Sequence, residues 1–458
     1  MTKLKHLVLA AATLCGLIAP AAYAAGSSAD AALIERGAYL ARLGDCIACH
    51  TARNGKPFAG GLAIQTPIGR IYSTNITPDR DHGIGAWTYD DFAVLMRHGQ
   101  TKAGYAVYPA MPYPSYSRVN DADMHALYAY FEHGVAPVAE ANRANEIPWP
   151  LSMRWPLKIW RWMYAPTPEP FADVAGPDAS AEHGAYLVEG LGHCGSCHTP
   201  RSVTLQEKAL TGDGNAIYLA GGGAIDGWIA PSLRNEHGGG LANWNEQEIV
   251  EFLHTGRTAR TASFGAMNDV IADSTQFMTT RDLQSIALYL KSLGAQAGNE
   301  ATKPYAYDAH VASQLFVGNV PAVPGAQLYL DRCAACHKSN GKGNGKAFPA
   351  LAGNPVLQTA NPTSAIHIVL SGGAQPSTQT APSTLTMAPY ADILSDQQVA
   401  DVVSFIQTGW GNTGGKATAA QVAKIRKGAT PVEARGLQVA EPELHHAAPA
   451  DQASGTRG

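Results

Sequence analysis

The sequence predicts a mostly α-helical chain made of three tandem copies of one small domain. Three Cys-x-x-Cys-His motifs begin at residues 46, 194 and 333, so they are spaced by 148 and 139 residues. Recurrence at a nearly constant period is typical of repeated structural units. At roughly 150 residues per domain, a chain of 458 residues has room for about three. A similar segment precedes each motif: Gly37-Ala38-Tyr39-Leu40, Gly184-Ala185-Tyr186-Leu187 and Gly325-Ala326-Gln327-Leu328.

Each copy is expected to contain a short helix before the motif, a middle helix and a closing helix. The middle helices are predicted from Trp87 to Gly99 and from Trp244 to Gly256, with a third one ending at Gly372. Glycine is the usual residue at a helix C-terminus, which fits all three ends. The closing helices contain Ala126–Phe131, Ile286–Leu290 and Val399–Ile406, with Asp123, Asp282 and Asp396 near their starts and Tyr130, Tyr289 and Phe405 as packing anchors.

The first 24 residues have the features of an export signal. Lys3 and Lys5 precede an apolar stretch that Pro20 ends, and Ala22-Tyr23-Ala24 is a small-x-small cleavage site. The alternative is an uncleaved anchor helix, which the shortness of the stretch disfavours. We therefore expect a protein exported to the periplasmic side of a bacterial inner membrane.

Composition excludes several classes of protein. Hydrophobic residues make up 45% of the chain and charged residues only 15%, below the roughly 25% of an average soluble domain, so a disordered chain is disfavoured. The formal net charge is -4, which argues against nucleic-acid binding through a basic face. No apolar run of membrane-spanning length follows the N-terminal segment.

The cysteines predict three covalently bound haem c groups. Once Cys15 is removed with the export signal, every remaining cysteine belongs to a Cys-x-x-Cys-His motif, the attachment pattern of c-type haem. Two thiols three positions apart lie on one side of a helical turn, where they can bond the two vinyl groups of one porphyrin. The adjacent histidine then reaches the iron. The attachment residues are Cys46, Cys49, Cys194, Cys197, Cys333 and Cys336, and the proximal ligands are His50, His198 and His337.

Other uses of the same cysteines explain the pattern less well. Three disulfides are compatible with an oxidising compartment, and redox-active dithiols would need a strand before each motif. A closed zinc site needs four ligands, whereas each motif offers three crowded ones. Neither the disulfide nor the dithiol reading accounts for a histidine in the same position of all three motifs.

Methionine is the expected sixth iron ligand, because this soft ligand raises the potential of a His-ligated haem. Met111, Met267 and Met387 each precede a closing helix, in predicted loops where proline or glycine fixes the backbone. The rivals Met96, Met124 and Met278 fall on predicted helices or close to one, where methionine usually fills gaps in a core. The prolines of Ala230-Pro231-Ser232-Leu233 and Phe348-Pro349-Ala350-Leu351 could accept the free N–H of a proximal histidine, or simply form turns.

From about Gly37 to Asn412, the chain resembles the tri-haem cytochrome c subunits of membrane-bound bacterial alcohol, gluconate and polyol dehydrogenases. The segments that carry the resemblance are Asn75-Ile76-Thr77-Pro78, Gly83-Ile84-Gly85-Ala86-Trp87, Arg97-His98-Gly99, Pro109-Ala110-Met111-Pro112-Tyr113, Gly227-Trp228-Ile229-Ala230-Pro231-Ser232-Leu233 and Trp410-Gly411-Asn412.

The resemblance implies three class I cytochrome c-like domains with Met111, Met267 and Met387 as ligands. It implies a non-catalytic electron-transfer subunit, in which a catalytic partner with PQQ or FAD passes electrons through three haems to ubiquinone. A small third subunit and peripheral contact with the inner membrane are further expectations. The alternatives are a multi-haem enzyme, such as a peroxidase or a sulfur-compound oxidiser, and an oxidase-linked cytochrome c subunit.

The predicted boundaries place the export signal at 1–24 and the three domains at 30–140, 176–297 and 319–412. A linker rich in tryptophan and proline covers 141–175 and a second linker covers 298–318. Tryptophans and cations alternate between 147 and 165, which suits a membrane interface or a protein interface equally well. Residues 413–458 are expected to form a polar, flexible tail, in which His445-His446 has no predicted metal role.

Overall fold

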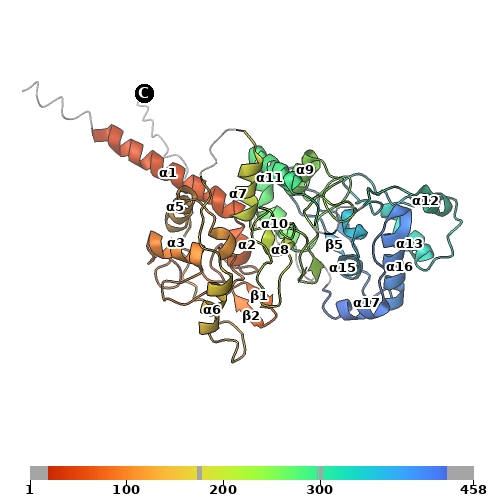
Figure 1. Ribbon diagram of the computed structural model, residues 1–458, viewed down its shortest axis with the longest axis horizontal. Helices are drawn as coiled ribbons and strands as arrows, with labels where there is room; N and C mark the ends of the chain where they lie inside the picture. The colour runs from red at the N-terminus through yellow and green to blue at the C-terminus, as the bar shows by residue number, and fades with distance from the viewer. Residues whose placement is uncertain (1–18, 173–177, 297, 299–302, 431–458) are drawn as a thin grey trace, which may run out of the picture.

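The computed structural model describes residues 19–172, 178–296, 298 and 303–430. Within these ranges it is mostly helical, as predicted, and its strands form three short antiparallel hairpins. We call the segment from α1 to η1 unit 1, that from α7 to α11 unit 2, and that from α12 to α17 unit 3. Unit 2 lies between unit 1 and unit 3 along the long axis of the molecule (Figure 1).

The three units share an order of elements: a helix that leads into the motif, a one-turn helix at the motif, a middle helix and a closing helix. Unit 1 contains α1 (Ala19–Leu43), α2 (Cys46–His50), β1 (Ala63–Thr66), β2 (Gly69–Tyr72), α3 (Tyr89–His98), α4 (Tyr113–Tyr116), α5 (Asp121–Ala129) and the π-helix η1 (Tyr130–Gly134). The connection to unit 2 contains α6 (Trp155–Tyr164).

Unit 2 contains α7 (Ala181–Glu189), α8 (Gly195–His198), β3 (Ala224–Ile225), β4 (Trp228–Ile229), α9 (Glu246–Thr255), α10 (Ala266–Asp273), η2 (Thr275–Phe277) and α11 (Thr280–Ser292). Unit 3 contains α12 (Ala309–Phe316), α13 (Ala326–Arg332), α14 (Ala334–His337), η3 (Pro355–Gln358), α15 (Thr363–Ser371), β5 (Gly373–Ala374), β6 (Thr386–Met387), α16 (Asp396–Thr408), η4 (Gly409–Gly411) and α17 (Ala419–Arg426).

The middle helices end where the sequence predicted. Capping boxes open α3 and α9, because the Thr88 and Asn245 side chains accept from the third backbone N–H of each helix. Gly99 and Gly256 close them with left-handed backbone conformations, at φ 61° and 75°. Both helices begin two residues later than predicted, because the tryptophans precede the capping residue.

The glycine repeated before each motif marks the place where the helix that leads into the motif crosses the closing helix of the same unit. A Cβ atom added to Gly37 would lie 1.9 Å from the Ala126 carbonyl oxygen of α5. At Gly184 the corresponding distance to the Ser285 oxygen of α11 is also 1.9 Å. At Gly325 the Asp401 oxygen of α16 lies 2.3 Å away. These distances are far below van der Waals contact, so only glycine permits the close approach, which explains the repeated segment.

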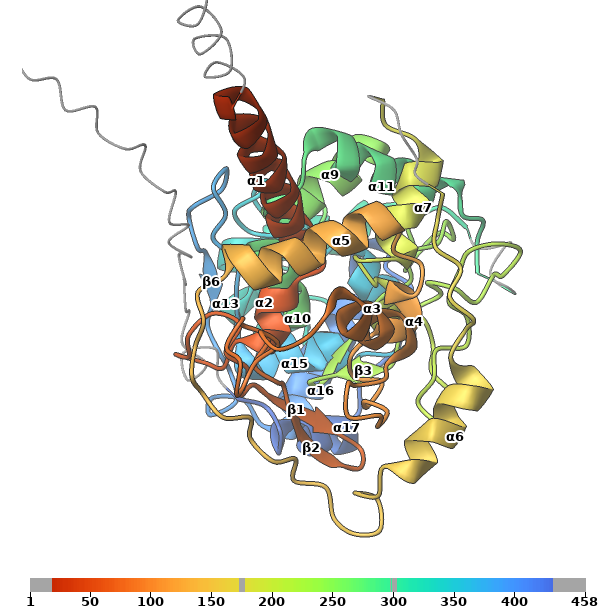
Figure 2. The same cartoon turned by 90° about the vertical axis from the view of Figure 1, so that its left-hand side faces the viewer.

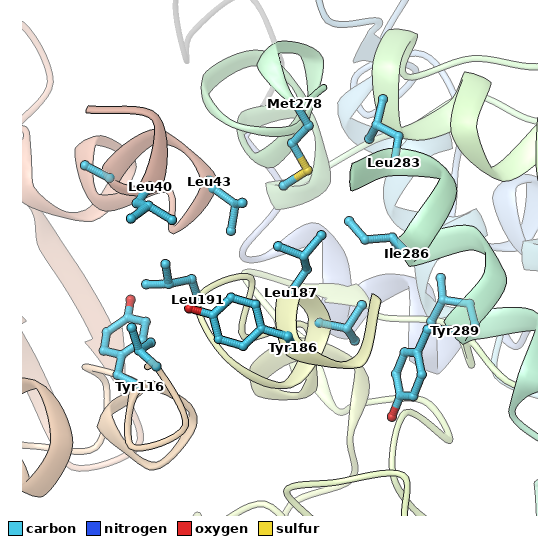
Figure 3. Packing of buried hydrophobic residues seen from close by; sticks show 14 of the residues in the cluster. Leu40, Leu43, Tyr116, Tyr186, Leu187, Leu191, Met278, Leu283, Ile286 and Tyr289 are labelled. Atoms are coloured by element: carbon cyan, nitrogen blue, oxygen red, sulfur yellow. The ribbon is translucent and has the colours of Figure 1, made fainter. Parts of the chain in front are cut away.

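Units 1 and 2 share one hydrophobic core, whereas unit 3 has its own. Leu40 and Leu43 of α1 and Leu187 of α7 contribute to the shared core, which Figure 3 shows from close by. Met278 fills the space between these side chains and Leu283 of α11. A common core fixes the first two units relative to each other more firmly than a flexible linker would.

Units 1 and 2 are also joined by a reciprocal pair of tyrosine–aspartate hydrogen bonds. The Tyr186 hydroxyl donates to Asp123 Oδ2 at 2.7 Å, and the Tyr39 hydroxyl donates to Asp282 Oδ2. Each tyrosine has the same place in its repeat, and each aspartate is the third residue of its closing helix. The contact therefore resembles a twofold, isologous interface. Unit 3 has Gln327 and Gln398 at these positions, so it lacks this pair.

Two predicted boundaries of the third domain are wrong. The predicted 298–318 linker contains α12, whose Ala312 and Leu315 are buried in the core of unit 3. The predicted flexible tail begins too early, because α17 packs with fully buried Val422, and Arg426 Nε lies 2.8 Å from Asp396 Oδ1. Both helices are short and contain several alanines between them, so each gives only a short hydrophobic pattern in the sequence. Residues 431–458 lie outside the described part of the chain.

At the N-terminus, α1 runs through the predicted cleavage site, from Ala19 to Leu43. Pro20 lies within the described part of this helix. Residues 1–18 of the predicted export signal lie outside the described residues. In the part of the chain that the structure describes, no helix has both the length and the apolar character needed to span a membrane.

Candidate haem sites

Each Cys-x-x-Cys-His motif forms one turn of helix. In unit 1 the turn is α2, and in units 2 and 3 it is α8 and α14, with Cys194 and Cys333 as the N-cap residues. The two cysteines of each motif therefore lie on one side of a single turn. All six are free thiols, so the structure contradicts the disulfide alternative for them. A helix rather than a strand precedes every motif, which also contradicts the dithiol alternative.

The proximal histidines share one orientation. Nδ1 of His50 donates to the Thr74 carbonyl at 2.7 Å, Nδ1 of His198 to the Pro231 carbonyl at 2.7 Å, and Nδ1 of His337 to the Pro349 carbonyl at 2.9 Å. Because a carbonyl only accepts, Nδ1 carries the proton and Nε2 keeps a lone pair. An imidazole in this tautomer is ready to bind a metal through Nε2.

The prediction that proline carbonyls orient the histidines is confirmed for Pro231 and Pro349. Thr74, which does the same in unit 1, was missed. It lies 24 residues after His50, against 33 residues in unit 2 and 12 in unit 3, and no proline marks it. Neither the spacing nor the residue type could have identified it.

The surroundings of the motifs favour the neutral forms of the proximal histidines and of the motif cysteines. Burial lowers the pKa of His50, His198 and His337, although the carbonyl of each pair opposes the shift. Burial also raises the pKa of Cys46 and Cys194 to about 12. A neutral imidazole is the form that coordinates iron, and the low polarity suits a porphyrin face.

The predicted sixth ligands lie in three different local structures. Met111 precedes α4 and packs against the shared core, and Met387 lies in β6 against the core of unit 3. Met267 was expected in a loop, but it lies in the first turn of α10. Gly265, with φ 59°, is the N-cap residue of α10. The glycine that suggested a loop therefore marks the start of a helix.

The rival methionines are core residues. Met124 is fully buried, and Met96 and Met278 are only 7% and 8% exposed. Figure 3 shows Met278 among leucines from α1, α7 and α11. Their burial in the core argues against these three methionines as iron ligands, whereas Met111, Met267 and Met387 are all half-exposed.

Together these features fit haem c. Each unit offers two thiols on one turn, a neutral imidazole with a free Nε2, and a half-buried thioether from another segment. A haem bound there would be attached through the two cysteines and coordinated by the histidine, with the methionine as the predicted sixth ligand. The same donors repeat in all three units, which is the strongest structural support for three equivalent sites.

The motifs of units 1 and 2 lie close together. Loss of surrounding water, then the carboxylate of Asp45 and the thiol of Cys197, raise the pKa of Cys49 to about 11. Asp45 and His193 directly precede the first cysteine of the motif in unit 1 and in unit 2, and both have positive φ angles. His193 Nε2 lies 3.3 Å from the Gly44 carbonyl oxygen of unit 1. Sequence reasoning missed these two residues, because only the folded contact reveals them.

The chain is similar to known cytochromes. The Cytochrome c family model matches residues 34–134 and 322–410, which fall in units 1 and 3. The alcohol dehydrogenase (quinone) cytochrome c subunit of Gluconacetobacter polyoxogenes is 52% identical over 421 residues, covering 92% of this chain and 90% of that protein. The gluconate 2-dehydrogenase cytochrome c subunit of Pantoea cypripedii is 53% identical over 89% of this chain and 92% of its own length. The fructose dehydrogenase cytochrome subunit of Gluconobacter japonicus is 35% identical, with shares of 88% and 84%.

Proposed function

Because the chain belongs to the family of cytochrome c subunits of quinone-linked alcohol and gluconate dehydrogenases, we propose that it is the electron-transfer subunit of such a complex. It receives electrons from a catalytic dehydrogenase subunit that contains PQQ or FAD. It passes them through three covalently bound haems to ubiquinone. The observation that carries the proposal is the repetition of one donor set in three units arranged in succession.

The residues of the chain have separate tasks in this function. When bound, each haem supplies an iron that gains or loses one electron. The cysteine pairs hold the group covalently, and the carbonyls of Thr74, Pro231 and Pro349 orient the histidines. The three predicted methionines would supply a soft thioether ligand, which raises the potential of a His-ligated iron relative to a second histidine or water. A histidine and a methionine at every iron would leave no position vacant for substrate, which disfavours a multi-haem enzyme.

The electron-transfer function can be tested with the purified holoprotein. Chemically reduced protein is expected to be reoxidised by a short-chain ubiquinone, and its reduced spectrum should not change when carbon monoxide is added. Reoxidation by hydrogen peroxide but not by quinone, together with carbon monoxide binding to one haem, would instead identify a peroxidase-type enzyme. Identifying the subunit that co-purifies distinguishes a PQQ partner from a flavin partner.

The proposed location is the periplasmic face of the inner membrane, with α6 as the peripheral contact. One face of α6 holds it on the protein, since Trp160 Nε1 donates to the Thr204 carbonyl at 2.8 Å and Arg161 to the His98 carbonyl at 3.2 Å. The other face is open, with Trp155 59% and Trp162 83% exposed. Figure 2 shows α6 at the periphery of the molecule. Tryptophans beside the exposed cation Lys158 suit the headgroup region of an anionic bilayer.

Replacing Trp155 and Trp162 together with alanine is expected to weaken binding to vesicles that contain phosphatidylglycerol. The loss should be at least about 10-fold, which corresponds to only about 1.4 kcal/mol of the burial energy of two indoles. Co-sedimentation of the holoprotein with the vesicles measures it. Phe316→Ala is the matched control, because Phe316 is 81% exposed on α12, in another unit. If vesicle binding is unchanged and the dehydrogenase subunit no longer co-purifies, α6 is a protein interface instead.

A further inference from the structure

The hairpin that carries Met387 is built against unit 2. In this hairpin Gly373 of β5 pairs with Met387 of β6, and Ala374 pairs with Thr386. At the start of β5, Gly372 has φ 71°, and a Cβ there would lie 2.5 Å from the Met387 carbonyl oxygen. The backbone of the methionine is therefore pressed against the end of α15. Residues 375–385, which connect the two strands, extend from unit 3 onto unit 2.

Asn268 joins the two methionine segments directly. It follows Met267 in α10, and its Nδ2 donates to the Ala374 carbonyl at 2.9 Å. Ser263 Oγ donates to Asn268 Oδ1 at 2.7 Å, which fixes the amide orientation. The residue next to the sixth ligand predicted for unit 2 thus binds the strand paired with the sixth ligand predicted for unit 3.

Arg257 holds the other end of the hairpin loop. It is 6% exposed, and its Nη2 donates to the Ala381 carbonyl at 2.7 Å and to the Ser383 carbonyl at 2.9 Å. Between these anchors, Gln276 Oε1 accepts from the Gln379 backbone N–H at 3.0 Å. Charge-assisted hydrogen bonds from a buried guanidinium are among the stronger polar contacts in proteins. Unit 2 therefore binds this hairpin through hydrogen bonds with Asn268, Arg257 and Gln276.

We propose that unit 2 completes the third iron site, with Asn268 and Arg257 acting as positioning residues for Met387. Without the contacts of Asn268 and Arg257, the loop between β5 and β6 loses its anchors at both ends and keeps the central bond to Gln276. Met387 is then no longer held in place. The inference rests on the proposed function only in taking Met267 and Met387 as iron ligands. The proposal makes iron coordination by Met387 in unit 3 dependent on Asn268 and Arg257 of unit 2.

The proton NMR spectrum of the reduced holoprotein tests this proposal, because a methionine methyl bound over a haem face is shifted far upfield. Three such signals are expected, and Met111→His, Met267→His and Met387→His should each remove one, which assigns them. Asn268→Asp keeps the side-chain shape but removes the donor to Ala374. Asn268→Asp and Arg257→Met should each shift or abolish the Met387 signal, leave the Met111 signal unchanged, and lower one midpoint potential.

Thr261→Val is the matched control. It removes the hydrogen bonds that Thr261 shares with Asn354 across the same interface, at 3.2 and 3.4 Å, without touching the hairpin. It should leave the Met387 signal in place. An unchanged Met387 signal in folded Asn268→Asp and Arg257→Met would overturn the inference while leaving the proposed function intact. If the methionine-to-histidine variants remove no signal, the ligand assignments themselves are wrong.

Discussion

Replacing Cys194 and Cys197 together with serine is expected to remove the haem of unit 2 and to stop electron flow from dehydrogenase to quinone. A serine hydroxyl forms no thioether with a vinyl group, so the porphyrin is not retained. Unit 2 lies between units 1 and 3, so the loss interrupts the route rather than shortening it (Figure 1). Haem content per chain measures the first effect, and quinone reduction by the complete complex measures the second.

The control for this variant is Ser196→Ala in the same motif. Ser196 Oγ donates to Glu207 at 3.3 Å, but it offers no bond to the porphyrin. This variant should keep its full haem content and its activity. Retention of three haems by the double serine variant would show that the second motif is not an attachment site.

Gly184→Ala is expected to destabilise the protein by about 3 kcal/mol, at the upper end of the usual cost of overpacking. The new methyl group would meet the Ser285 carbonyl oxygen at 1.9 Å and Tyr289 Cβ at 2.7 Å, and both belong to α11. Helix α7 can accept it only by moving away from α11. Because this helix pair also lines the core shared with unit 1, the shift disturbs both units.

Chemical denaturation followed by circular dichroism measures this change in the free energy of unfolding. Gly223→Ala is the control, since a Cβ at Gly223 would meet no atom within 4 Å. The control should unfold within about 0.5 kcal/mol of the wild type, as most surface substitutions do. Equal stability of the two variants would mean that the helices do not cross as closely as the structure has them.

The parts of the fold that the sequence predicted are those with a local chemical signature. The three motifs and the C-capping glycines of α3 and α9 each impose a short-range constraint, and the glycine before each motif repeats in the sequence with it. The middle helix and the closing helix of each unit could be predicted because their own residues also repeat along the chain. The mostly helical architecture could therefore be predicted from one chain.

The parts that the sequence did not predict depend on contacts between distant segments. Nothing near Thr74 marks it as the partner of His50, and nothing in Tyr39 indicates that it binds Asp282 of another unit. The helix α17 was missed because its short, alanine-rich pattern looks like a solvated tail until Val422 is seen to be buried. Met267 was placed in a loop because the glycine before it, Gly265, is as typical of a loop as of a helix start.

The central claim is that each of the three motifs carries one covalently attached haem. The most direct test is the intact mass of the exported holoprotein, measured after denaturation in acid so that non-covalent ligands are lost. The predicted mass is that of the polypeptide plus three haem groups, and proteolysis should recover one haem peptide from each motif. A mass excess of fewer than three haems, or a motif peptide with two free thiols, would contradict the account.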